Sequence, residues 1–146
     1  MHIRRAVLDD MPTVAVLHHH TMRTSLPFLP DLHTPDEVRD YFRDHMFPIN
    51  DVWVADQDGE VIGYTARGGG WLNQLYVHPD HQGQGVGDAL LVKAMDGVDE
   101  LQLWAFQQNT RARLFYEKRG FTLAELTDGA GNMEKTPDAR YEWRRG

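Results

Sequence analysis

Hydrophobic residues recur along this chain with two different periods, and the change from one period to the other predicts the order of its secondary structure. Short runs rich in β-branched and aromatic residues, bounded by Gly, Pro or Asp, predict strands. These runs are residues 1–7, 52–55, 61–65, 71–77, 101–106, 121–127 and 139–143. Asp58-Gly59 is a hairpin signal between the second and third runs. Gly68-Gly69-Gly70 predicts a turn before the fourth run.

The first two helices are predicted between residues 9 and 48. Asp9 or Asp10 is expected to cap the first helix with its carboxylate. Its apolar face is Met11, Val14, Leu17 and Thr21 or Met22. The capping box Thr34-Pro35-Asp36-Glu37 opens the second helix, which we expect to end at Pro48. The residues predicted to share one face of this second helix are Val38, Tyr41, Phe42 and His45.

Two further helices follow the fourth and fifth strands. One begins after a glycine-rich loop and runs to about Met95, and the other begins at the cap Asn109 and stops at Gly120. The resulting order is β-α-α-β-β-β-α-β-α-β-β. Consecutive strands without a helix between them imply antiparallel pairs, and the strands around the glycine-loop helix imply one parallel crossover. The pattern predicts an α/β (α+β) fold, a mixed and mostly antiparallel sheet flanked by helices, in one domain spanning residues 1–146.

Composition narrows the class of protein. The chain has 146 residues with 41% hydrophobic content, enough for one ordinary domain. No run approaches the roughly eighteen apolar residues of a membrane span, and the formal net charge of −7 disfavours a nucleic-acid partner. There are no cysteines, so the chain has neither disulfides nor a thiol nucleophile. We expect a cytoplasmic protein with no membrane and no nucleic-acid partner.

The loop after the fourth predicted strand carries the clearest chemical signal. It reads Val77-His78-Pro79-Asp80-His81-Gln82-Gly83-Gln84-Gly85-Val86-Gly87 and leads into a helix. Glycines let the backbone approach an anion, and the free N–H groups and dipole of a helix start favour a phosphate there. A nucleoside triphosphate loop would need a lysine, and a dinucleotide fingerprint would need glycine where Asp88 stands. A diphosphate such as that of coenzyme A remains, against the alternative of a turn without a ligand.

Here the sequence resembles the GNAT superfamily of acetyltransferases. The superfamily's Gln/Arg-x-x-Gly-x-Gly/Ala signature is matched by residues 82–87, and its Leu-Tyr-Val-x-Pro strand by residues 75–79. A second signature, Asn-x-x-Ala-x-x-Phe-Tyr-Glu-Lys-x-Gly-Phe, is matched by residues 109–121. The resemblance is strong from about Trp71 to Phe121 and loose elsewhere. It implies acetyl-CoA as cosubstrate, with no metal, and a sheet splayed between the fourth and fifth strands.

The resemblance also implies roles for particular residues. The cofactor-binding residues are the strand Leu75, Tyr76 and Val77, the loop Gln82, Gly83, Gln84, Gly85, Val86, Gly87 and Asp88, and the motif residues Asn109 and Ala112. Tyr116 is the general acid that protonates the departing sulfur, against the alternative of a tyrosine that only packs in the core. The general base is unassigned, because the strand where the family often carries one has the amides Asn73 and Gln74. These amides could hold a water that relays a proton.

Several features stay open or are interpreted as structural. The acceptor is an amine of a small molecule or peptide, and the sequence does not identify it; nor does it show whether longer acyl-CoAs are used. A homodimer is compatible with this interpretation. The alternative to an enzyme is a non-catalytic acyl-CoA-binding module on the same fold. We interpret His18-His19-His20 as surface residues, one of which could line the acceptor site, because neighbouring helical residues point about 100° apart.

Two other polar groups are candidates for contacts with a substrate. Asn132 and Glu134 are candidates for acceptor contacts. The basic cluster Arg111, Arg113, Lys118 and Arg119 is interpreted as a solvated helix face, from which one arginine could reach the 3′-phosphate of coenzyme A.

Overall fold

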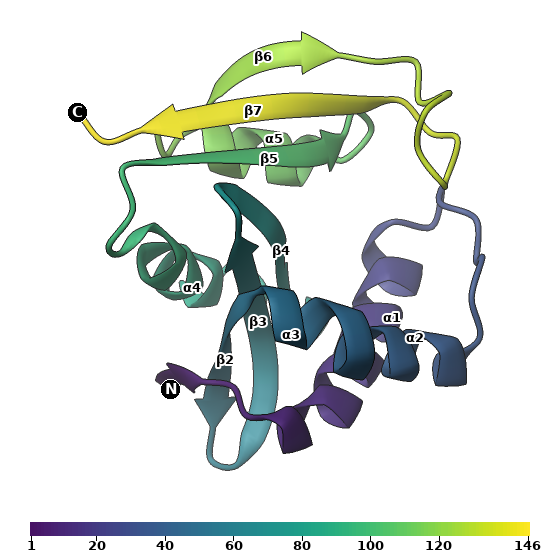
Figure 1. The fold of residues 1–146 in the computed structure, drawn as a ribbon, viewed down its shortest axis with the longest axis vertical. Coiled ribbons are helices and arrows are strands. Elements are labelled where there is room, and N and C mark those ends of the chain that lie inside the picture. The colour runs from purple at the N-terminus through teal and green to yellow at the C-terminus, as the bar shows by residue number, and fades with distance from the viewer. The chain divides into compact units, whose positions relative to one another are not determined.

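A computed structural model describes residues 1–146, and the chain divides into two compact units, Met1–Asp96 and Gly97–Gly146. All seven predicted strands and all four predicted helical segments are present, in the predicted order (Figure 1). No helix is long and apolar enough to cross a membrane. The placement of all residues in one domain stays a prediction, as does the splay between the fourth and fifth strands.

The first unit is built on four antiparallel strands. They are β1 (His2–Arg5), β2 (Asp51–Gln57), β3 (Glu60–Gly68) and β4 (Trp71–Val77), each paired with the next. Asp58 and Gly59 both have positive φ, 55° and 86°, as the hairpin turn after β2 requires. The predicted hairpin is therefore confirmed.

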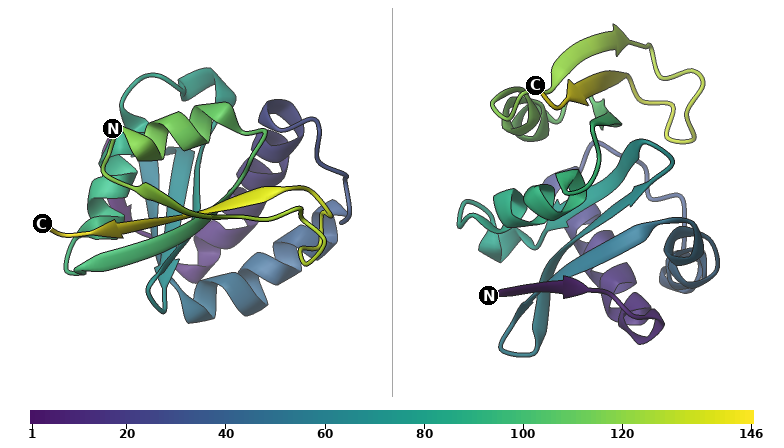
Figure 2. Two further views of the ribbon diagram at one scale, coloured as in Figure 1. Left: turned by 90° about the horizontal axis from the view of Figure 1, so that it is seen from above. Right: turned by 60° about the vertical axis from the view of Figure 1, so that its left-hand side comes forward.

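Helices cover both faces of this four-stranded sheet (Figures 1 and 2). On one face lie α1 (Met11–Ser25), α2 (Pro35–Tyr41), a π-helical turn (Phe42–Met46) and the short α3 (Phe47–Ile49). Their apolar side chains pack on the side chains of β2 and β3 that share this face, including Val54 and Tyr64. On the other face α4 (Val86–Met95) packs Val86 and Leu90 against Ile62 and Val77.

The second unit is an antiparallel sheet with one helix. Its strands are β5 (Glu100–Phe106), β6 (Thr122–Leu126) and β7 (Asp138–Arg144), with β7 paired to both others. Helix α5 (Thr110–Glu117) joins β5 to β6 (Figure 2). Gly120 has φ +91°, so the predicted stop of this helix is confirmed.

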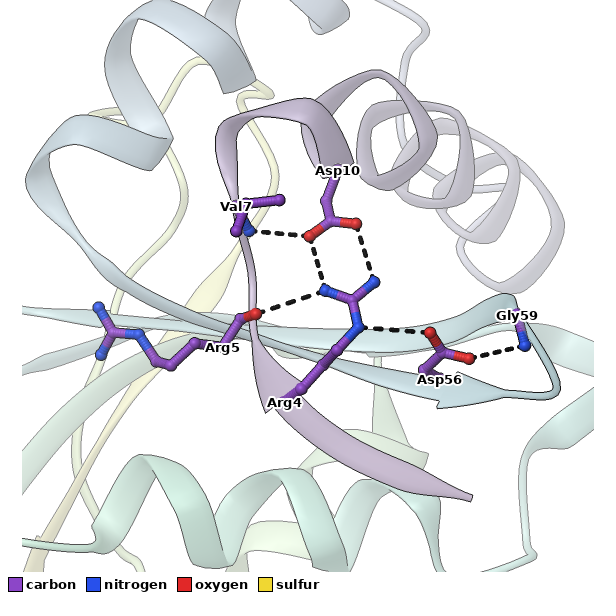
Figure 3. A network of polar contacts seen from close by, with 6 residues as sticks. All are labelled: Arg4, Arg5, Val7, Asp10, Asp56 and Gly59. Atoms are coloured by element: carbon purple, nitrogen blue, oxygen red, sulfur yellow. Dashed lines mark hydrogen bonds and ion pairs between the residues drawn. The ribbon is translucent and has the colours of Figure 1, made fainter.

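The start of α1 differs from the prediction that Asp9 or Asp10 caps it with a carboxylate. Asp10 occupies the N-cap position, but its carboxylate does not bond to the amides of the first turn. It accepts instead from the Val7 N–H at 2.8 Å and from both terminal nitrogens of Arg4, at 2.8 and 2.9 Å (Figure 3). A 3₁₀ turn over Leu8–Asp10 precedes the helix, which leaves the carboxylate pointing back toward β1.

Arg4 extends this contact to the β2–β3 hairpin. Its Nε donates to Asp56 at 3.3 Å, and the other oxygen of Asp56 accepts from the Gly59 N–H at 2.8 Å (Figure 3). A bidentate guanidinium–carboxylate pair fixes geometry better than a single contact does. The network therefore fixes the first turn of α1 on the sheet, and with it the direction of the whole helix.

The second helical segment also departs from the prediction. We expected it to end at Pro48, with Tyr41 and His45 on its apolar face, but it continues to Ile49 and both of these side chains are exposed. A π turn widens the helix, with the Phe47 N–H bonded to the Phe42 carbonyl, and shifts the buried positions to Phe42 and Met46. Beyond the proline, the Asn50 side chain donates to the Met46 carbonyl at 2.8 Å.

Candidate functional site

Strand β4 supplies the first part of the candidate site. Leu75, Tyr76 and Val77 pair with Thr65, Tyr64 and Gly63 of β3. The register gains one residue between Leu72 and Gln74, which makes Asn73 a β-bulge. Bulges re-aim the side chains that follow them. Beyond this one, Gln74 and Tyr76 point to the α1 side of the sheet, whereas Leu75 and Val77 pack on the α4 side.

The loop after β4 is held by its own side chains. A 3₁₀ turn spans Pro79–His81, and the His78 imidazole accepts from the Asp80 N–H at 3.1 Å. Gln82 turns back, so that its amide donates to the Val77 carbonyl at 3.0 Å and to the Ser25 hydroxyl at 3.4 Å. Gln82, the first residue of the GNAT signature, therefore ties the loop to the end of its strand and to the end of α1.

The backbone at Gly83 and Gly85 has the left-handed conformation. Their φ angles are +79° and +85°, and Gly85 is the N-cap of α4. A Cβ built on Gly85 would meet no atom within 4 Å, so this side of the backbone is open. The Ala89 N–H bonds to the Gly85 carbonyl. The amides of Val86 and Gly87 lie before this bond, in the first turn of the helix, where N–H groups are not used by the helix itself. The loop thus has the open backbone that the predicted pyrophosphate site requires, and this role stays a prediction.

Gly87 needs a different explanation from the one its motif suggests. Unlike Gly83 and Gly85, Gly87 lies inside α4 and is not among the residues with positive φ. The Gly87 amide lies in the first turn of α4. Asp88 follows it directly, and the exposed Gln84 precedes the N-cap Gly85. A glycine that the motif does not include also matters, because a Cβ on Gly63 would lie 3.1 Å from Leu90 and 3.2 Å from Val86. Gly63 therefore allows the start of α4 to lie close against β3.

The α1 side of the sheet brings together residues that the sequence did not connect. The His18 Nδ1 lies 2.6 Å from the Tyr64 hydroxyl, and this hydroxyl in turn donates to the Gln74 side-chain carbonyl. The His18 ring lies between Phe42 and Tyr76, with centroids 5.0 and 5.2 Å away. Burial, and after it the charge of His19, lower the pKa of His18 to about 4. Of the three neighbouring histidines, one of which could line the acceptor site, His18 is the one that α1 turns toward the sheet, where it is partly buried, whereas His20 is exposed.

The side-chain amides of Asn73 and Gln74 on β4 both form hydrogen bonds. Asn73 donates to the Asn50 side chain at 2.8 Å, and the carbonyl of Gln74 accepts from Tyr64. Tyr64 is fully buried, and burial raises its pKa well above the usual value, so it stays a hydrogen-bond donor at neutral pH. Neither amide can act as a base, in agreement with the unassigned base of the sequence analysis.

In the second unit, the predicted motif residues lie on α5. The Asn109 side chain accepts from the Ala112 N–H at 3.2 Å, which confirms Asn109 as the N-cap. Ala112 is half-buried in the first turns, and Tyr116 is 8% exposed. The Tyr116 ring contacts Phe115 and Phe121 with centroids 5.2 and 5.3 Å away. These positions are compatible with the roles that the resemblance implies for Asn109, Ala112 and Tyr116, and those roles stay predictions.

The basic cluster on α5 is not one solvated face. Arg113 donates to the buried Tyr141 hydroxyl at 3.0 Å, and this hydroxyl donates to Glu117 at 2.5 Å. Arg119 lies over the Phe115 ring at 3.8 Å and donates to the Phe115 carbonyl. Arg113 and Arg119 therefore make contacts that stabilise α5, whereas Arg111 and Lys118 are exposed. Arg113 makes its contact through β7, and Arg119 through Phe115 of α5 itself.

Asn132, a candidate contact for the acceptor substrate, forms hydrogen bonds within its own loop. Its amide donates to the Thr136 carbonyl at 2.7 Å and to Asp138 at 3.1 Å, and its carbonyl accepts from the Thr136 N–H. The side chain of Asn132 thus closes the turn before β7. The backbone carbonyl of the neighbouring candidate, Glu134, accepts from the Thr136 hydroxyl at 3.0 Å.

Known proteins share both the sequence pattern and the fold. The model of the acetyltransferase (GNAT) domain matches residues 48–123. An uncharacterized N-acetyltransferase of Archaeoglobus fulgidus is 28% identical over 90% of this chain and 99% of its own length. The peptidyl-lysine N-acetyltransferase YjaB of Salmonella typhimurium is 29% identical, with 83% of each chain covered.

Solved structures agree with the predicted fold. The apo form of YjaB from Escherichia coli superposes with a TM-score of 0.80 at 23% identity, covering 99% of this chain and 98% of its own. YncA of Salmonella typhimurium, solved with acetyl-CoA, gives a TM-score of 0.76 at 21% identity, covering 100% and 94%. The predicted fold class is confirmed by these likenesses. Since the family model covers half of the chain, and N-acetyltransferases match most of it, this chain belongs to the GNAT superfamily and is an acetyl-CoA-dependent N-acetyltransferase.

Proposed function

We propose that the chain transfers the acetyl group of acetyl-CoA directly to a primary amine of a small molecule or peptide, with both substrates bound at once. The observation that carries this proposal is the strand, loop and helix from Leu75 to Asp88. Left-handed Gly83 and Gly85 expose backbone, and α4 begins immediately after them. The pyrophosphate would lie on the amides from Gln82 to Asp88, and the pantetheine arm along Leu75, Tyr76 and Val77.

The reaction requires the protein mainly to position the two substrates and to transfer protons. In this proposal main-chain amides near Leu75 and Tyr76 polarise the acetyl carbonyl, as donors of an oxyanion hole do. The amine attacks in its neutral form, and the C–S bond breaks. Tyr116 protonates the departing sulfur, while Asn109 and Ala112 contact the pantetheine.

A lysine side chain in a peptide is the acceptor to test first. Relatives from Salmonella typhimurium and Escherichia coli are named as peptidyl-lysine N-acetyltransferases, at 29% and 25% identity. The chain's net charge of −7 suits a cationic acceptor. Small amines are the other class within the proposal.

Thiol release from acetyl-CoA tests the proposal. The assay uses a peptide with one free lysine and a blocked N-terminus, and a parallel panel of small primary amines. We expect amine-dependent release of CoA, with intersecting double-reciprocal plots, since both substrates must be bound together. Parallel plots would indicate an acetyl-enzyme intermediate and contradict direct transfer. Binding of acetyl-CoA without release by any amine would favour the acyl-CoA-binding alternative.

A further inference from the structure

A chain of three hydrogen-bonded side chains crosses from α1 to the bulged part of β4. His18 lies on α1, Tyr64 on β3 and Gln74 on β4. The His18 Nδ1 is 2.6 Å from the Tyr64 hydroxyl, which donates to the Gln74 Oε1. Gln74 immediately precedes Leu75, the residue at which the proposed function places the acetyl carbonyl.

The order of donors in this chain fixes the protonation of His18. Tyr64 has one hydroxyl proton, and it goes to the carbonyl oxygen of Gln74, which can only accept. The lone pair of the Tyr64 oxygen must then accept from His18, so Nδ1 carries the hydrogen. In a neutral imidazole the other nitrogen is an acceptor. With this orientation of the Gln74 amide, Nε2 of His18 is the nitrogen that accepts a proton.

The surroundings keep this imidazole neutral. Phe42 comes from the π turn, Tyr64 from β3 and Tyr76 from β4, and all three rings contact the His18 ring. The titratable neighbours are His19 on α1, Tyr64 and Tyr76 on the sheet, and Tyr41 beside Phe42. None of these supplies a negative charge at neutral pH, and burial lowers the pKa of His18 to about 4. A neutral imidazole does not repel an incoming cationic substrate. With a pKa of about 4, it also releases a bound proton readily at neutral pH.

We propose that Nε2 of His18 receives the proton that the acceptor amine loses as it attacks the thioester. This inference rests on the proposed function and supplies the base that β4 lacks. The amine nitrogen forms a bond to the carbonyl carbon, and the C–S bond breaks. One N–H proton passes to Nε2 and then to water, while the sulfur takes its proton from Tyr116, whose phenolate regains a proton from water before the next turnover. Tyr64 and Gln74 are positioning residues that hold the required tautomer.

Nitrogen NMR of the histidine rings tests the tautomer without any acceptor. The full chain is labelled with ¹⁵N-histidine and recorded between pH 6 and 8, and His18 is assigned by its loss in His18→Phe. We expect His18 to carry hydrogen on Nδ1 in the wild type. In Gln74→Leu the Tyr64 hydroxyl loses its acceptor and can turn its proton to Nδ1, so a shift toward the Nε2–H tautomer is expected. Hydrogen on Nε2 in the wild type would overturn the inference.

Kinetics test the role in catalysis. His18→Phe keeps an aromatic ring but removes the acceptor nitrogen, so kcat should fall by about 10²-fold or more while KM for acetyl-CoA stays near its wild-type value. The deficit should narrow as pH rises, since hydroxide can replace a lost base. His20→Phe is the matched control, because His20 is exposed on the same helix and stacks on His78 instead.

The positioning variant separates the possible outcomes. Gln74→Leu changes neither His18 nor Tyr116, yet kcat should fall about tenfold as the active tautomer becomes a minority. Should His18→Phe fold poorly, Gln74→Leu and the NMR measurement still decide. A folded His18→Phe with wild-type kcat overturns this inference and leaves the N-acetyltransferase intact. A wild-type chain that binds acetyl-CoA but acetylates no amine contradicts the proposed function instead.

Discussion

Asp10 shows how one side chain at a helix start makes folding stability depend on pH. The hydrogen bonds with Arg4 are the largest cause that lowers the pKa of Asp10 below its ordinary value of 3.8, and the Val7 N–H adds to it. Its carboxylate side chain is 13% exposed, so water screens the pair only in part. Replacing Asp10 with Asn should cost about 1–3 kcal/mol of unfolding free energy at pH 7.

The sign of the pH effect follows from the direction of the shift. Because the folded state holds the Asp10 proton less tightly than the unfolded state, the contribution is complete above about pH 4. It is lost as pH falls through the depressed folded pKa. Urea unfolding of the wild type and Asp10→Asn at pH 7, 4 and 3 should show a difference that narrows toward pH 3. Asp9→Asn, at an exposed neighbour, is the control, and an Asp10→Asn gap that widens in acid would refute the assignment.

Tyr116 is the residue where a packing role and a chemical role separate most cleanly. Tyr116→Phe keeps the ring contacts with Phe115 and Phe121, so the melting temperature should stay close to that of the wild type. A proton donor that acts only as sulfur charge develops affects kcat and kcat/KM together. We expect kcat to fall by about 10²-fold, near the lower end for acid–base groups, since a thiolate leaves tolerably without help.

Tyr141→Phe is the matched control for that experiment. It also removes a tyrosine hydroxyl from the second unit, but this hydroxyl joins Arg113 to Glu117. Its loss should lower the unfolding free energy by about 1–3 kcal/mol and affect turnover less than Tyr116→Phe does. Steady-state kinetics and thermal melts of both variants distinguish the two roles. A wild-type kcat in Tyr116→Phe would show that Tyr116 only packs in the core.

Among the elements, the loop between β4 and α4 depends most on backbone conformation. At Gly85 a side chain would meet no neighbour, but φ +85° strains any other residue by about 1–3 kcal/mol. Gly85→Val should therefore fold with reduced stability and lose affinity for CoA, since its branched side chain occupies the open side of the loop. Calorimetric titration with CoA measures the affinity.

Gly70 offers a control with the same strain and no proposed ligand. It lies in the turn before β4, with φ +83° and open space around a built Cβ. Gly70→Val should lose stability to a similar extent and keep wild-type CoA affinity. If Gly85→Val also bound CoA normally while folded, the loop would be only a turn.

For the whole molecule, the ligand that stabilises folding distinguishes the kinds of phosphate site. A ligand that binds only the folded chain contributes about 2.7 kcal/mol at a hundredfold excess over its Kd, which corresponds to roughly 5–10 °C in Tm for a chain of this size. We expect such a rise with acetyl-CoA or CoA in thermal melts. ATP and NAD should give none, because the loop lacks the lysine of one signature and has Asp88 where the other needs glycine. Equal shifts with ATP would contradict the assignment.

Local sequence determined the elements of this protein and the conformation of its glycine-rich loop. Apolar spacing, turn residues and caps together predicted all seven strands and the four main helical segments, because these signals are local to each element. They did not predict the 3₁₀ turns at Leu8–Asp10 and Pro79–His81. The glycines at 83 and 85 and the cap Asn109 have local roles that are fixed within a few residues of the chain. Two motifs in the expected order were therefore enough to suggest the family.

Tertiary structure decided everything that joins distant segments. His18 meets Tyr64 46 residues away, and Arg113 meets Tyr141 28 residues away. No spacing rule connects such pairs, so the sequence placed His18 with its surface neighbours and Arg113 on a solvated face. Pro48 likewise did not end its helix, which continues to Ile49, and of the predicted apolar face Phe42 is buried whereas Tyr41 and His45 are exposed. Hydrogen-bond partners and pKa values depend on which elements pack together, and the pattern of a single segment does not contain that information.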